Sequence, residues 1–258
     1  GGRLARLIGP RLGASRKALR NLERAMPELT PEARRAIVAG MWDNLGRVAA
    51  EYPHLARLWG EGGDCRVEIR GSEHLTAAAA TGKPAILVSG HLANWELLSN
   101  AAARHGMPLT LIYRRPNNPL VARMLDRARG PIGGQHIAKG RSGARALLAA
   151  LRDGRSIGML LDQKLNDGVP VPFFGRDAMT APAAAQFAIR FGAPFLPARI
   201  ERLAGAHFRW TVMPPIEPVA GDPDAAMRDL LVRFNALLES WIRERPAQWL
   251  WLHRRWSD

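Results

Sequence analysis

The chain has 258 residues, enough for one large α/β domain or two small ones, and 47% of them are hydrophobic. No segment is repetitive or low in complexity, so a largely disordered protein is not expected. The 37 Lys and Arg residues outnumber the 23 Asp and Glu residues and leave a net charge of +14. This excess favours nucleic acid, anionic lipid or an acidic carrier protein as a partner, although a GC-rich genome, which favours Arg codons, explains it without any function.

Two structural features are missing from the sequence. The single cysteine, Cys65, rules out an intrachain disulfide bond and a multi-cysteine zinc site. No run of about 18 apolar residues could cross a bilayer, and no signal peptide is present. Because the chain begins at Gly1 without a methionine, we expect a membrane anchor in an N-terminal segment preceding these residues, or else peripheral attachment.

The first 60 residues carry helical patterns. Leu and Ile recur at three- and four-residue spacings among many Arg residues over 3–26, and Gly9 and Pro10 interrupt the pattern. We therefore expect a short basic lead followed by helices. Thr30 as N-cap and Pro31 at the first helical position predict a long helix from there. Arg-rich amphipathic helices of this kind are typical of proteins that bind an anionic membrane surface.

From Val67 onward, short apolar runs alternate with helical patterns. We expect strands at 67–71, 84–90, 109–114, 156–163, 194–202 and 207–218. We expect helices at 74–82, 143–154, 181–192 and 222–243. This alternation predicts an α/β fold with a central, mostly parallel or mixed sheet flanked by helices, and with N-terminal helices before it. We expect one domain, residues 1–258, with a helical lead over 1–60 and an α/β core over 65–258.

A polar pair follows the buried strand in the stretch AILVSGHLANWELL, residues 85–98. Asn94 is a candidate N-cap that places Glu96 in the first turn of the next helix, where the helix dipole stabilises a charged carboxylate. Glu96 could then accept the proton of one ring nitrogen of His91 and leave the other nitrogen as a base. A capped turn with a solvent-facing histidine is the simpler interpretation of the two residues alone.

The nucleophile for such a base is not obvious in the sequence. No G-x-S-x-G motif occurs, and Cys65 stands apart without a signature, so no residue is a clear candidate for a covalent acyl-enzyme. A substrate hydroxyl is the remaining candidate, and its attack on a carbonyl requires a cation to stabilise the oxyanion. The Arg residues of YRRPNNPL, residues 113–120, are placed to supply that cation.

The stretch GHLANWE resembles the H-x-x-x-x-E/D signature of the glycerolipid acyltransferase superfamily, and in particular of the bacterial lipid A biosynthesis (late) acyltransferases of the lauroyl/myristoyl type. Further segments are similar to this family in the same order over nearly the whole chain: NLERAMPEL, MWDNLGRVAAEY, YRRPNNPLV, LLDQK, VPFFGR, MTAP and ERPAQWLWLHRRW. The resemblance implies an O-acyltransferase with a glycerolipid acyltransferase-like fold. The membrane-spanning helix that such proteins usually carry before the first basic helix is absent from these residues.

The resemblance also implies roles for individual residues. His91 is then the general base and Glu96 its charge-relay partner, with no covalent acyl-enzyme. Arg114 corresponds to the Arg of a Y-R motif that acts on the oxyanion or on a substrate phosphate. Asp162 and Gln163 correspond to a D-Q element that lines the same site, and Asn94 within the signature is grouped with these substrate- or oxyanion-binding candidates.

Two more segments have both a functional and a structural interpretation. The segment KGRSGAR, residues 139–145, stands at the start of a predicted helix. Its candidate phosphate ligands are Lys139, Arg141 and Arg145. The alternative is that these side chains form a solvated basic face. The segment DGVPVPFFG, residues 167–175, contains two Phe residues. They either line an acyl-chain groove or enter the membrane surface, or else they fill the core. No metal or organic cofactor is expected, since no ligand pattern for a metal is present.

In the last segment, QWLWLHRRW, alternation would place Trp249, Trp251 and His253 on one face of a strand. Trp beside Arg suits the interface between lipid and water, and burial against the sheet is the alternative.

The expected function is transfer of a fatty acyl group from an acyl carrier protein thioester to a hydroxyl of a lipid A precursor, at the cytoplasmic face of a bacterial inner membrane. The expected partners are acyl carrier protein, anionic membrane lipid and the lipid A precursor, and nucleic acid is not expected. One alternative keeps the chemistry but uses a lysophospholipid, aminolipid or glycolipid acceptor. Another is a nonenzymatic basic protein that binds a membrane surface or nucleic acid.

Overall fold

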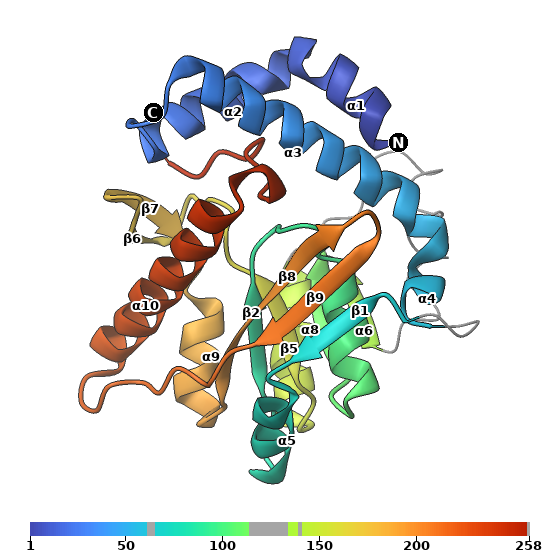
Figure 1. Cartoon of the computed structure of the whole chain (residues 1–258). Coiled ribbons are helices and arrows are strands. Elements are labelled where there is room, and N and C mark those ends of the chain that lie inside the picture. Colours follow the sequence, from blue (N-terminus) through green and yellow to red (C-terminus); the bar gives the residue numbers. More distant parts are fainter. Residues whose placement is uncertain (61–64, 114–133, 139–140, 257–258) are drawn as a thin grey trace.

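A seven-stranded sheet forms the centre of this computed structural model, which describes residues 1–60, 65–113, 134–138 and 141–256 (Figure 1). The strand order is β1 (Val67–Arg70), β9 (His207–Val212), β8 (Phe195–Ala204), β2 (Ile86–Ser89), β5 (Ile157–Leu160), β3 (Leu109–Tyr113) and β4 (Gly134–Ala138). Every neighbouring pair is parallel except β8 and β9, which are antiparallel. The predicted α/β fold with a mostly parallel, mixed sheet is therefore confirmed.

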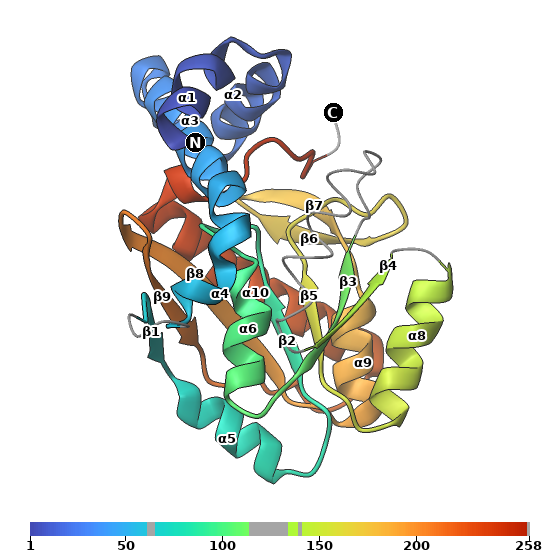
Figure 2. The same cartoon turned by 90° about the vertical axis from the view of Figure 1, so that its right-hand side faces the viewer.

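Two hydrophobic cores lie on the two faces of the sheet, because successive side chains of a strand point to opposite faces. Ile86 and Val88 of β2 face one core, and Leu87 faces the other. Three helices cover the first face: α8 (Arg141–Arg152), α9 (Ala183–Phe191) and α10 (Pro223–Glu244). The second face is covered by α5 (Ser72–Ala80) and α6 (Leu97–Arg104), and Figure 2 shows both layers of helices.

The N-terminal residues form helices, as predicted. They are α1 (Gly2–Ile8), η1 (Gly9–Arg11), α2 (Gly13–Ala25) and α3 (Pro31–Glu51), followed by η2 (Tyr52–His54) and α4 (Leu55–Leu58). Thr30 caps α3, since its hydroxyl accepts a hydrogen bond of 3.2 Å from the backbone N–H of Ala33. The helices α1 to α3 lie above one edge of the sheet in Figure 1, and they contribute Leu22 and Met41 to the first core.

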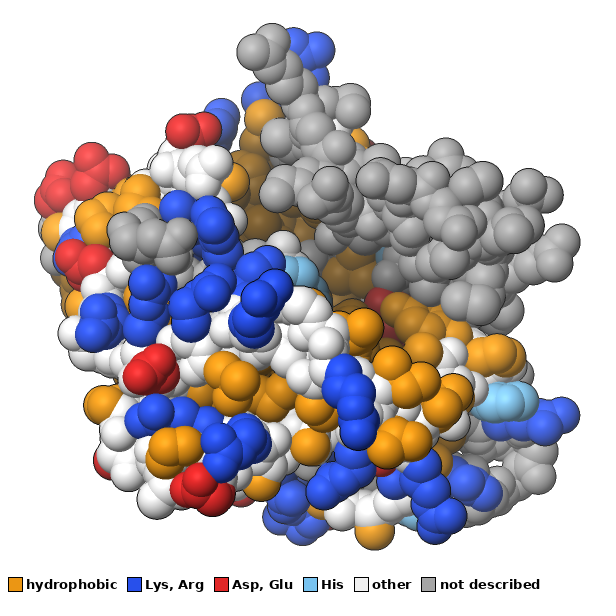
Figure 3. Space-filling view, turned by 90° about the horizontal axis from the view of Figure 1, so that it is seen from above, with side chains coloured by type: hydrophobic (Ala, Val, Ile, Leu, Met, Phe, Trp, Pro, Cys, Tyr) orange, Lys and Arg blue, Asp and Glu red, His pale blue; other side chains and the backbone are white. Residues whose placement is uncertain are grey.

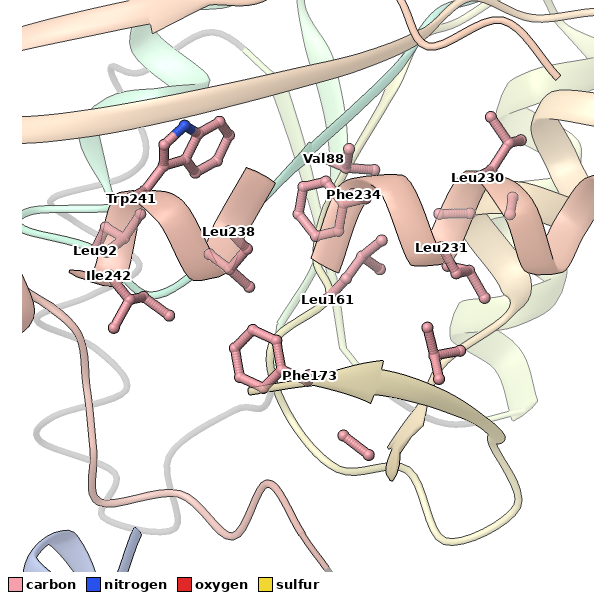
Figure 4. Packing of buried hydrophobic residues seen from close by; sticks show 14 of the residues in the cluster. Val88, Leu92, Leu161, Phe173, Leu230, Leu231, Phe234, Leu238, Trp241 and Ile242 are labelled. Atoms are coloured by element: carbon pink, nitrogen blue, oxygen red, sulfur yellow. The ribbon is translucent and has the colours of Figure 1, made fainter. Parts of the chain in front are cut away.

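A hairpin includes most of the segment DGVPVPFFG, residues 167–175. Its strands are β6 (Val169–Phe173) and β7 (Arg176–Thr180), which pair antiparallel. Phe173 and Phe174 are buried, which supports the core-filling interpretation of this segment. Figure 4 shows Phe173 close to Leu161 and to Leu238 of α10, within the first core.

Three features of the strands differ from the expectations. The strand at 207–218 ends at Val212, because Pro214 and Pro215 follow and have no N–H for a ladder. β4 was not foreseen. The last segment forms the short helix η3 (Pro246–Gln248) and then turns, with a single bridge from Trp249 to Leu92, so its aromatic residues do not share a strand face. Within the described ranges, no helix combines the length and the hydropathy needed to span a bilayer.

Candidate active site

The site lies at the carboxyl edge of the sheet, where two neighbouring strands end side by side. β2 and β5 run parallel, with Ser89 opposite Leu160 at their last residues. The residues that follow the two strands, His91 and Asp162, therefore meet although they are 71 positions apart in the chain. This edge is where α/β proteins commonly bind their ligands.

Asp162 holds His91 through two contacts. The ring Nδ1 of His91 lies 2.7 Å from Oδ1 of Asp162, and the backbone N–H of His91 donates to Oδ2 at 2.7 Å. The indole N–H of Trp249 also donates to Oδ2, at 2.8 Å. Only 2% of Asp162 is exposed, so the carboxylate is fully surrounded by these donors.

The charge state of Asp162 follows from this environment. Burial raises the pKa of this carboxyl, but the charge of His91 and the hydrogen bonds from His91 and Trp249 lower it by more. The net pKa of Asp162 lies well below its usual range, so the group is an ionised acceptor near neutral pH. In the neutral ring, Nδ1 of His91 must then carry the proton, which leaves a lone pair on Nε2.

The sequence had given Glu96 as the carboxylate partner of one ring nitrogen of His91, but in the structure the carboxylate at the ring is that of Asp162. Oε1 of Glu96 instead accepts a hydrogen bond of 2.9 Å from the hydroxyl of Tyr52. The helix begins at Leu97, so Glu96 is its N-cap residue rather than part of its first turn. Asn94 lies before the cap, and its Oδ1 accepts from the N–H of Glu96 at 3.3 Å.

The other side of the His91 ring faces Gln163 and two aromatic rings. Nε2 of His91 lies 3.2 Å from Nε2 of Gln163, which lies the same distance from Nε2 of His253. The indole of Trp95 meets the His91 ring edge to face, with centroids 5.1 Å apart. The His91 side chain remains 14% exposed.

A buried polar network supports the loop that carries His91. Ala93 adopts a left-handed conformation with φ of 45°, which is costly for a residue with a side chain. Asn44 of α3 donates to the carbonyl of Ala93 at 3.0 Å, and Asn94 donates to Glu51 of α3 at 2.9 Å. Arg202 of β8 joins the two, since it pairs with Glu51 and donates to Asn44 at 3.0 Å. The loop is thus held from α3 and from the sheet.

Of the predicted cationic ligands, only Arg145 has a side chain among those that the structure describes. Arg114 and Lys139 lie outside the described residues. Arg141 begins α8, but its side chain is not among those described, and Arg145 is exposed on the same helix. α8 follows β4, which is three strands away from β2. Phosphate binding by this segment stays a prediction.

Sequence reasoning did not place several neighbours of His91 and of its loop at the site. Trp249 and His253 come from the C-terminal segment, whose resemblance to the family was the only signal for them. Nothing local marked Glu51 and Arg202 as partners, because an ion pair across 151 positions leaves no local pattern. In the described part of the chain, no group of three or more His, Cys, Asp or Glu residues is placed to hold a metal ion.

The fold and this site define an α/β enzyme with a histidine–carboxylate pair at the carboxyl edge of its sheet. The whole chain, residues 1–258, matches the family described as bacterial lipid A biosynthesis acyltransferase, and the chain belongs to that family. It is therefore an O-acyltransferase, as the sequence predicted.

Several curated proteins are similar to the chain. A lipid A biosynthesis acyltransferase of Haemophilus influenzae is 27% identical over 256 residues, covering 97% of this chain and 78% of that protein. A lipid A biosynthesis lauroyltransferase of Escherichia coli is 27% identical over 248 residues, or 92% of this chain and 77% of that protein. A phosphatidylinositol mannoside acyltransferase of Mycobacterium tuberculosis is 29% identical over 196 residues, or 73% of this chain and 59% of that protein. The similarity thus extends to enzymes named for two different acceptors.

Proposed function

We propose that the protein transfers a fatty acyl group from an acyl carrier protein thioester to a hydroxyl of a lipid A precursor, with His91 as the general base. The observation that carries this proposal is the ionised carboxylate of Asp162 against Nδ1 of His91, which leaves Nε2 unprotonated at an approachable edge of the sheet. Family membership and the lipid A relatives support the choice of acceptor.

The proposed reaction needs no covalent acyl-enzyme. Nε2 of His91 takes the proton of the acceptor hydroxyl as its oxygen attacks the thioester carbonyl. The tetrahedral intermediate then breaks its C–S bond, and the leaving sulfur takes the proton from His91, which gives an ester and a free thiol. Asp162 stabilises the imidazolium that exists between these steps, so it takes the role that the sequence gave to Glu96. Arg114 is the proposed cation for the oxyanion.

Anionic partners fit the surface of the N-terminal helices. Large apolar side chains are exposed in one short segment: Leu4, Leu7, Ile8 and Leu12. Exposed arginines accompany them: Arg3, Arg6, Arg11, Arg16 and Arg20. Figure 3 looks onto the face with α1 to α3 and shows basic side chains gathered among hydrophobic ones. The proposed partners of this face are anionic lipids of the cytoplasmic leaflet, and the net charge of +14 also suits an acidic acyl carrier protein.

The test is to incubate the protein with acyl carrier protein thioesters and a tetraacylated lipid A precursor, and to measure the masses of the lipid products by mass spectrometry. A mass gain of one acyl group that disappears in His91→Ala is the expected result. His207→Ala, which removes an exposed histidine on β9, is the matched control and should keep the product.

A parallel incubation with phosphatidylinositol mannoside tests the second class of acceptor, for which the Mycobacterium relative is named. Acylation of that lipid alone would contradict lipid A as the acceptor while leaving the chemistry intact. Full activity in His91→Ala would rule out the general-base role.

A further inference from the structure

A second histidine lies beside the proposed base. The ring centroids of His91 and His253 are 5.3 Å apart, and the side-chain amide nitrogen of Gln163 lies between the rings, 3.2 Å from each Nε2. An amide nitrogen carries two N–H groups and can donate to both rings at once. One amide group thus links two imidazoles.

The direction of these hydrogen bonds follows from Asp162. Because Asp162 is an acceptor, Nδ1 of His91 carries the proton and Nε2 can only accept while the ring is neutral. Gln163 must therefore present its N–H groups, not its carbonyl oxygen, to Nε2 of His91. The second N–H then requires an acceptor, and Nε2 of His253 is the group at that place.

His253 is suited to be that acceptor. Burial is the largest cause that lowers its pKa, to about 4, and the charge of His91 acts in the same direction, so its ring is neutral at pH 7. The backbone around it is fixed from α2, because the side-chain amide of Asn21 donates to the carbonyls of His253 at 2.7 Å and of Trp251 at 2.8 Å. The other charged groups of the described chain that act on His253 are Asp162, after β5, and Lys17 of α2.

We propose that His253 is a positioning residue: by accepting a hydrogen bond at Nε2, it holds the amide of Gln163 with an N–H toward Nε2 of His91 and so keeps the resting base neutral and aligned. The role of His91 as base rests on the proposed function, but the geometry of the three side chains does not. His253 itself acts only through Gln163.

The arrangement has a consequence for proton transfer. Once His91 has taken a proton at Nε2, an N–H of Gln163 opposes it, so the amide must rotate and offer its carbonyl oxygen. Rotation breaks the hydrogen bond to His253. His253 therefore favours the neutral form of His91 in the resting enzyme. In a variant without this acceptor the amide of Gln163 rotates freely, so His91 becomes protonated at a higher pH.

The test compares His253→Phe, which keeps a ring but removes the acceptor, with His253→Gln, which restores an acceptor oxygen. In His253→Phe, the acid limb of the kcat/KM profile should move upward by about half a unit to one unit, as expected for the loss of one hydrogen bond to the neutral form. His253→Gln should return the limb toward its original position, and KM should stay the same in both variants. A uniform loss of kcat at every pH would mean a merely structural role and would overturn the proposal, as would a shift to lower pH.

Nitrogen NMR of the full chain gives a readout that does not depend on acyl transfer. The Nε2 resonance of His91, assigned with His91→Gln, should move in His253→Phe toward that of an imine nitrogen without a hydrogen bond. An unchanged resonance would overturn the proposal even if the enzyme transfers no acyl group to lipid A. If His253→Phe does not fold, His253→Leu removes the same acceptor from Gln163 and is measured in its place, with the same outcomes.

Discussion

At the scale of single residues, the proposed chemistry depends on a carboxylate that stays ionised although it is buried. Three donors make this state stable: the ring and the backbone N–H of His91, and the indole of Trp249. Each of them needs Asp162 as an acceptor, so the carboxylate orients the ring and the start of the loop together. The side-chain amide of an asparagine has the same size but would present an N–H to one of these donors.

Asp162→Asn is therefore expected to lower kcat by roughly 10²–10⁴-fold with little change in KM, because the His91 ring loses its fixed tautomer. The measurement is the initial rate of acyl transfer as a function of acceptor concentration. Asp167→Asn, an exposed aspartate in the following turn, is the matched control and should keep the original rate. A loss of less than tenfold in Asp162→Asn, with the fold intact by circular dichroism, would contradict the role given to Asp162.

The sequence located His91 well and its partner poorly, for a physical reason. The apolar run of β2 and the turn after it are local features, so the position of His91 at the end of a strand could be predicted. The partner depends on which strand lies beside β2 and in which register, and β5 is some 70 residues further along the chain. Glu96 was the nearest carboxylate in sequence, whereas Asp162 is the one that the strand pairing brings to the ring.

At the scale of elements, the loop after β2 is supported by a buried ion pair that joins α3 to β8. The side chains of Arg202 and Glu51 are only 9% and 12% exposed, and Arg202 also lies over the ring of Phe208 at 4.6 Å. Helix boundaries such as that of α3 followed from its cap and could be predicted. The contacts between α3 and β8 could not, because charged residues on a helix are ordinarily exposed and nothing local marks these two as buried.

Arg202→Met is expected to lower the free energy of unfolding by about 3–5 kcal/mol, because the charge of Glu51 stays buried without its partner. Chemical denaturation checks this value. Arg209→Met removes an Arg–Glu pair between β9 and β1 whose side chains are 26% and 41% exposed, and it should cost much less. Adding Glu51→Gln to Arg202→Met should recover part of the loss. Equal effects in Arg202→Met and Arg209→Met would show that the ion pair does not support the loop.

At the scale of the whole molecule, the apolar segment of α1 and η1 and the edge of the sheet that carries His91 lie on the same side, since α3 passes above that edge (Figure 1). A protein that rests on a bilayer through α1 would therefore turn this edge toward the lipid. Leu4 and Leu7 are 63% and 62% exposed, which leaves most of their apolar surface free to enter the interface.

Leu4→Ser with Leu7→Ser is expected to weaken binding to vesicles of phosphatidylglycerol and phosphatidylethanolamine by on the order of tenfold or more, since each buried leucine contributes about 1.5–3 kcal/mol. Sedimentation with vesicles measures the bound fraction. Leu203→Ser with Val219→Ser removes exposed apolar side chains outside the N-terminal helices and should leave binding unchanged. Equal binding by all three proteins would argue against α1 as the membrane contact.

The pH dependence of stability is also a property of the whole molecule, and His253 contributes to it. Its folded pKa of about 4 lies below the ordinary histidine value of about 6.5, mainly because of burial, so between these pH values the unfolded chain binds a proton that the folded chain does not. The contribution of His253 is therefore complete above pH 6.5 and is lost as the pH falls toward 4. From pH 7.5 to pH 5.0, the free energy of unfolding should fall by about 2 kcal/mol more in the original protein than in His253→Gln. Denaturation at the two pH values measures this difference. The control His207→Gln should lose as much stability between the two pH values as the original protein does. Equal losses in the original protein and in His253→Gln would mean that His253 is not buried as a neutral ring.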